Sequence, residues 1–86
     1  QEYDLAEQTL DAYAAQYPKD YEPYAFRAML YITLENRKEQ SARDYSAAVE
    51  AYETAGQLLR SDDDATYYQQ LQSLIQQLQK EGWING

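Results

Sequence analysis

Apolar and polar positions follow an α-helical period along most of the chain, and they predict four helices, at residues 3–16, 21–35, 44–59 and 63–80. In the first helix, Asp4, Glu7 and Asp11 lie on the polar side. Its predicted inward face comprises Leu5, Ala6, Thr9, Leu10, Ala12, Tyr13 and Tyr17. Pro18 ends the helix, because the residue before a proline is driven out of helical geometry. We therefore expect an amphipathic helix with a solvated acidic stripe.

The second predicted helix is apolar around nearly its whole circumference. Asp20 is the expected cap, and Pro23 lies in the first turn, where a missing N–H group costs nothing. Only Glu22, Arg27 and Thr33 interrupt the apolar residues between positions 22 and 34. A helix of this kind has neighbours on several sides, or it leaves one side open for a partner.

A polar stretch at 36–43 predicts a loop, and we interpret its basic residues as solvated rather than as an anion site. Asp44, alone or with Ser41 in a capping box, is suited to start the third helix. The predicted inward positions of this helix are Tyr45, Ala48, Val49, Tyr52, Ala55, Gly56 and Leu59. Glycine inside a helix costs on the order of 1 kcal/mol relative to alanine. We therefore expect a neighbouring helix close to Gly56.

Ser61 and the three carboxylates at 62–64 are suited to begin the fourth helix, where they complement the positive end of the helix dipole. The predicted buried stripe of this helix is Tyr67, Tyr68, Leu71, Leu74, Ile75 and Leu78. Gly82 indicates a left-handed stop, after which Trp83 or Ile84 folds back onto Leu78 or Leu74. The whole pattern predicts a single all-α domain.

The composition and charge of the chain exclude several classes of function. The 86 residues carry a net charge of −8, with the acidic excess at both ends of the chain, and they include neither histidine nor cysteine. Nucleic acids and anionic membrane surfaces require clustered Lys and Arg, so neither is an expected partner. Most nucleophile–base pairs and transition-metal sites need His or Cys. We therefore expect no enzyme, no cofactor and no metal.

The spacing of small and aromatic residues resembles the tetratricopeptide repeat, a pair of antiparallel helices of about 34 residues. The matching residues are Tyr24, Ala28 and Tyr31 for a first helix, Ala48, Tyr52 and Ala55 for a second helix, and Ala6, Leu10 and Pro18 for the second helix of a preceding unit. The resemblance implies a right-handed stack of helix pairs, a capping fourth helix and non-catalytic protein binding. The long loop at 36–43, Arg27 at an apolar position and Arg60 in place of a closing proline depart from the family pattern.

In the resembling family, peptides contact the first helix of each pair. By that resemblance, the candidate partner-binding residues are Glu22, Ala25, Phe26, Met29, Ile32 and Thr33. An apolar groove with an acidic rim favours a hydrophobic or basic peptide, or a neighbouring helix. The alternative is that the first and fourth helices cover this surface, which would make these residues core.

A second, weaker resemblance concerns residues 43–84. The run Arg43-Asp44-Tyr45 and the closing Gly82-Trp83-Ile84 are similar to C-terminal segments of some bacterial Ser/Thr-kinase-like signalling proteins. This resemblance implies an alternative function, a structural or regulatory appendage that packs on its own upstream domain. The chain itself has no kinase motif.

The chain has no apolar run long enough for a membrane span and no signal peptide. We therefore expect no membrane insertion and a cytoplasmic location. Because the chain has the pattern of a piece of a larger bacterial protein, an exported location stays open.

Overall fold

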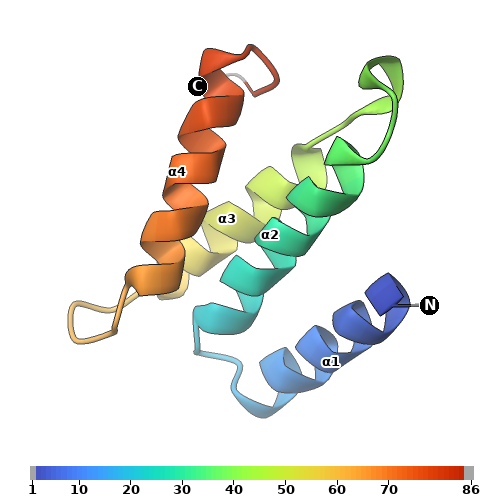
Figure 1. Cartoon of the computed structure of the whole chain (residues 1–86). Helices are drawn as coiled ribbons and strands as arrows, with labels where there is room; N and C mark the ends of the chain where they lie inside the picture. The colour runs from blue at the N-terminus through green and yellow to red at the C-terminus, as the bar shows by residue number, and fades with distance from the viewer. Residues whose placement is uncertain (1, 85–86) are drawn as a thin grey trace.

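The computed structural model describes residues 2–84 and contains four α-helices, so the predicted all-α fold class is confirmed. The helices are α1 (Glu2–Gln16), α2 (Glu22–Asn36), α3 (Ser46–Leu58) and α4 (Thr66–Lys80), and a short 3-10 helix, η1 (Gln40–Ala42), lies in the loop before α3. Figure 1 shows α2 between α1 and α4, with α3 behind it. None of the described helices combines the length and apolar character that a membrane span requires.

The most extensive helix contact joins α2 to α3 through a seam of alanines. Ala25 and Ala28 of α2 and Ala48, Ala51 and Ala55 of α3 are all buried. Because an alanine side chain is a single methyl group, the two helix backbones approach closely without bulky residues between them. Ala51 was absent from the predicted inward face of this helix, yet it belongs to the seam.

The fourth helix completes the core by covering one side of this pair. Its buried residues are Leu71, Ile75 and Leu78, one helical stripe that packs with the alanine seam in a single hydrophobic cluster. The predicted stripe was wider and included Tyr67 and Leu74, which are 40% and 42% exposed. Those two residues lie at the edge of the core stripe of α4 and stay partly in water.

The first helix lies outside this core. It packs against α2 and makes no substantial contact with α3 or α4. The predicted solvated stripe holds for Asp4 and Asp11, which are exposed, although Asp11 also pairs with Arg27 of α2. It was wrong for Glu7, which is half-buried beside the Tyr31 hydroxyl. Leu5, predicted to face inward, is 64% exposed. The face of α1 that meets α2 is therefore rotated from the predicted one.

Three helices begin with the same turn, in which an aspartate lies two residues before the helix. The Asp20 carboxylate accepts the backbone N–H of Glu22 at 2.9 Å, as expected for the second helix. Asp44 accepts both the N–H and the hydroxyl of Ser46, at 3.0 and 2.6 Å. Asp64 accepts the same pair of donors from Thr66, at 3.1 and 2.6 Å. Because the aspartate precedes the helix in this turn, α3 and α4 begin two and three residues later than predicted.

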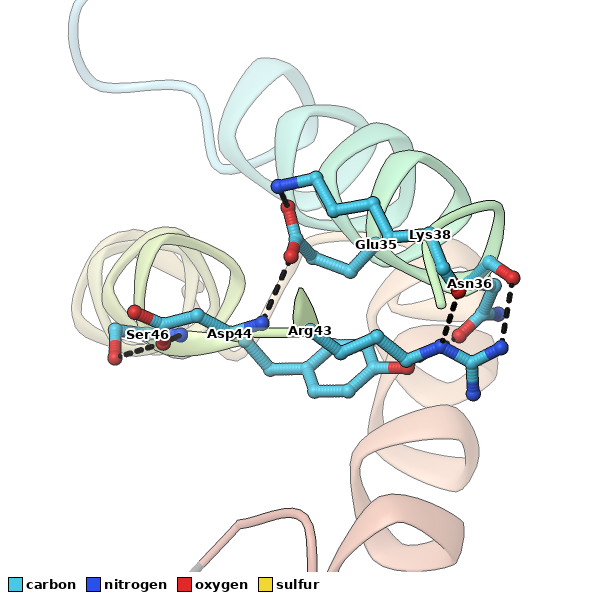
Figure 2. A network of polar contacts seen from close by, with 7 residues as sticks. Glu35, Asn36, Lys38, Arg43, Asp44 and Ser46 are labelled. Atoms are coloured by element: carbon cyan, nitrogen blue, oxygen red, sulfur yellow. Dashed lines mark hydrogen bonds and ion pairs between the residues drawn. The ribbon is translucent and has the colours of Figure 1, made fainter. Parts of the chain in front are cut away.

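A polar network fixes the long connection between α2 and α3 (Figure 2). The Glu35 carboxylate accepts the backbone N–H of Asp44 at 2.8 Å and pairs with Lys38, also at 2.8 Å. The Arg43 side chain donates to the backbone carbonyls of Asn36 and Lys38, both at 3.0 Å. These bonds close the loop onto the end of α2, so Arg43 stabilises the loop rather than serving as a free surface cation.

The chain after α4 folds back onto this loop. Gly82 has a φ of +84°, and the Trp83 N–H donates to the Leu78 carbonyl at 2.9 Å, which confirms the predicted left-handed stop. The Trp83 ring contacts Tyr45 edge-on at 5.7 Å and lies 5.5 Å from the guanidinium of Arg43. The end of α4 is thereby held against the start of α3.

Gly56 lies where the Tyr68 ring of α4 reaches α3. A Cβ atom placed on Gly56 would lie 2.8 Å from the Tyr68 hydroxyl oxygen. The ring stacks on Tyr52 at 5.3 Å and meets Tyr21 edge-on at 6.4 Å, so it has little freedom to retreat. The predicted close approach to Gly56 is confirmed, with a side chain rather than a helix backbone as the neighbour.

This contact predicts strong coupling between positions 56 and 68. Gly56→Ala alone lowers the free energy of unfolding by about 1 kcal/mol, because the steric overlap outweighs the gain in helix propensity. In a Tyr68→Phe background, where the overlapping oxygen is absent, the same change raises it by up to about 1 kcal/mol. Urea denaturation of the four proteins of this double-mutant cycle measures the coupling. Additive effects of the two substitutions would contradict the packing described.

The aspartate turns predict a loss of stability in acid. Hydrogen bonds from Ser46 and Thr66 hold the pKa values of Asp44 and Asp64 below their ordinary value of 3.8. The unfolded chain therefore takes up protons first as the pH falls. The stabilisation is present above the ordinary pKa and disappears as the pH falls through the lowered pKa of the folded state.

The test is the doubly substituted Asp44→Asn, Asp64→Asn chain, because asparagine keeps an oxygen acceptor but does not titrate. Its unfolding midpoint in urea changes less between neutral and acidic pH than that of the wild type. Asp62→Asn, on the same loop as Asp64, is the matched control. An unchanged pH dependence in the double variant would show that the two carboxylates do not contribute in this way.

Candidate functional site

Four of the six residues predicted to bind a partner form one stripe on α2. Glu22, Phe26, Met29 and Thr33 recur at steps of four, three and four, which places them on one side of the helix. Thr33 is exposed and the other three are half-buried. The stripe is therefore open to solvent along part of its length.

The other two predicted residues belong to the core. Ala25 is fully buried and Ile32 is 3% exposed, and both lie in the hydrophobic cluster with α3 and α4. Their side chains are turned away from the stripe by about a quarter of a helical turn. The alternative interpretation of this surface, burial under neighbouring helices, thus holds for Ala25 and Ile32 but not for the stripe.

Helix α4 extends the stripe with two apolar residues that sequence reasoning assigned to the core. Tyr67 and Leu74 are seven residues apart and so lie on one line of α4. The Tyr67 ring contacts the Phe26 ring, with centroids 4.7 Å apart. We call the combined set of Glu22, Phe26, Met29, Thr33, Tyr67 and Leu74 the α2–α4 surface. In the sequence, Tyr67 and Leu74 are marked by their angular offset around α4 from Leu71, Ile75 and Leu78. Those three residues form the buried stripe of α4 without them.

One end of the α2–α4 surface is acidic. Tyr13 of α1 donates to a carboxylate oxygen of Asp20 at 3.0 Å or of Glu22 at 3.3 Å. Burial, the hydrogen bonds and the negative charges of these carboxylates raise the pKa of Tyr13 to about 12. The phenol is therefore a neutral donor at physiological pH.

The polar groups near the surface have structural partners. The Thr33 hydroxyl donates to the Met29 carbonyl at 3.0 Å, one turn earlier on the same helix. Asp63 accepts the backbone N–H of Arg60 at 2.8 Å, and Asp64 caps α4 through Thr66. These contacts account for the acidic run before α4 as turn and cap formation. The chemistry that remains on the α2–α4 surface is apolar contact with a carboxylate at one end.

No protein-family model, curated protein or solved structure matches this chain. The resemblance to the tetratricopeptide repeat therefore stays a prediction from the spacing of residues. What can be said of the site comes from its own geometry.

Two leucines on α4 provide a direct check on which residues form the core. Leu71→Ala lowers the free energy of unfolding by about 2–5 kcal/mol, because it leaves a cavity in a fully buried position. Leu74→Ala, three residues later, lowers it by less than about 1 kcal/mol, because much of that side chain is already in water. Urea denaturation of both variants makes the comparison. Equal losses would show that Leu74 is buried and would remove it from the α2–α4 surface.

Proposed function

We propose that this domain is a non-catalytic interaction module that binds a peptide or a partner helix on the α2–α4 surface. The observation that carries the proposal is the exposure of Tyr67 and Leu74 on one line of α4, together with the contact between the Tyr67 ring and Phe26 of α2. Large apolar side chains from two helices are partly exposed to water instead of being buried in the core. Adjoining exposed apolar residues of this kind mark interaction sites more often than isolated ones do.

The composition of the surface suits peptide recognition. Tyrosine and phenylalanine supply rigid apolar area at a low entropic cost, and a methionine side chain adapts to differently shaped partners. A partner with apolar residues one helical turn apart would match the steps along α2. The tetratricopeptide-like arrangement, in which helix pairs stack and present one face to a peptide, is part of this proposal and rests on the residue spacing described above.

The charge of the surface favours neutral or basic partners. Glu22 lies at one end of the stripe, next to Asp20, and the whole chain carries a net charge of −8. Basic residues beside the apolar anchors of a peptide would be attracted to this end, whereas acidic ones would be repelled. Catalysis is not part of the proposal, because the chain offers neither histidine nor cysteine for it.

The test is a selection of peptides from a random display library against the domain, followed by calorimetry with the selected peptides. Met29→Glu and Leu74→Glu each weaken binding at least about tenfold, because each places a charge in the apolar contact. Circular dichroism and the unfolding midpoint show that both variants stay folded.

The matched control is Leu5→Glu, which introduces the same charge at an exposed leucine on α1, outside the α2–α4 surface. It leaves peptide binding unchanged. The proposal fails if the selection enriches no peptide. It also fails if Leu5→Glu weakens binding as much as Leu74→Glu does.

A further inference from the structure

The contact between α1 and α2 differs in kind from the rest of the structure. No residue of α1 belongs to the hydrophobic cluster that joins α2, α3 and α4. Among the side chains of α1 that the structure describes, only Ala14 is buried. The helix is therefore attached to α2 without a share in the core, which removes the main source of stability that a helix in a protein has.

Half-buried apolar side chains and a few charged contacts hold α1 in place instead. The apolar side chains are Ala6, Leu10 and Tyr13. The helix carries four carboxylates and no basic residue. Asp11 pairs with Arg27, Glu7 lies beside the Tyr31 hydroxyl, and the Arg37 guanidinium lies 4.9 Å from the Tyr3 ring. Asp11 is largely exposed, and an ion pair of this type contributes only about 0–1 kcal/mol.

The packing around Arg27 is also incomplete. Its Nε atom is buried and has no hydrogen-bond partner within residues 2–84. A cavity of about 270 Å³ opens beside it, between α2 and α3. A buried donor left without an acceptor weakens the interface that contains it.

The connection between the two helices has space to move. A cavity of about 510 Å³ lies between residues 16–22, which join α1 to α2, and residues Arg60, Asp63 and Asp64 of the α3–α4 loop. Tyr21 at the end of the connection belongs to the core cluster, so only residues 16–20 can move into this space without displacing a core side chain.

We propose that α1 is a detachable helix that covers a second docking surface, and that this surface fits an acidic amphipathic helix. The α1-docking face consists of Arg27, Leu30, Tyr31 and Leu34 of α2. Leu30 and Leu34 are half-buried although neither belongs to the core cluster. The resident helix shows what fits there, namely carboxylates one turn apart that meet Arg27 and Tyr31. The proposal is independent of the α2–α4 surface.

Native-state hydrogen exchange tests whether α1 detaches. Amides in the middle of α1 exchange at least about tenfold faster than those in the middle of α3, because they open without unfolding the core. Raising the salt from about 0.01 M to about 1 M speeds exchange in α1 several-fold and leaves α3 unchanged, because salt screens the exposed ion pair. Equal protection of α1 and α3 would overturn the proposal.

A labelled synthetic peptide of residues 3–19 tests the docking surface in trans. Ala14→Arg in the full chain replaces the buried alanine of α1 and releases that helix while the core stays intact, as circular dichroism would show. The peptide binds this variant at least about tenfold more tightly than the wild type, whose own α1 occupies the surface. Arg27→Gln, added to the Ala14→Arg chain, weakens binding several-fold.

The matched control is the same peptide with Glu7→Gln and Asp11→Asn, which keeps the shape of the helix but removes its two charges. It binds the Ala14→Arg chain several-fold more weakly than the wild-type peptide. If neither peptide binds, or if both bind equally, α2 has no surface that selects an acidic helix and the proposal fails.

Discussion

The close approach of α2 and α3 is the constraint on which the rest of the structure depends. The seam between the two helices is lined by alanines, which contribute only methyl groups. The larger side chains therefore pack outside the seam. The Tyr21, Tyr45 and Tyr68 rings pack against the same core beyond the seam, and α4 supplies the aliphatic residues that close it. With ten tyrosines and few large aliphatic residues, the chain builds a thin core. A thin core leaves many side chains half-buried, as the burial along α2 shows.

The faces of α2 follow from this arrangement. The face with Ala25, Ala28 and Ile32 belongs to the core, and another face meets α1. Between them runs the stripe with Phe26 and Met29, where the Tyr67 ring of α4 contacts Phe26. The nearly continuous apolar character of α2 thus reflects three helical neighbours and one face that the described chain leaves partly open.

Much of the fold could be predicted from periodicity and from the residues that start and stop helices, because both signals are visible in the local sequence. Pro18, the aspartates before α2, α3 and α4, and Gly82 indicated the helix order and most of the boundaries. The rotation of α1 could not be predicted in this way, since it depends on Arg27 and Tyr31 across the interface. The same limit applies to the site. Met29 and Phe26 were predicted from the family resemblance, but Tyr67 and Leu74 were assigned to the core, because a helical stripe does not reveal how far the neighbouring helices extend over it.

The central claim is that the stripe on α2 and the edge of α4 are partly open, whereas the faces of both helices that meet α3 belong to the core. Hydroxyl-radical footprinting with mass spectrometry measures this directly, with each rate normalised to the intrinsic reactivity of the side chain. We predict rapid modification of Met29, Tyr67 and Leu74, and strong protection of Leu71 and Tyr45. Protection of Leu74 and Tyr67 equal to that of Leu71 would contradict the claim.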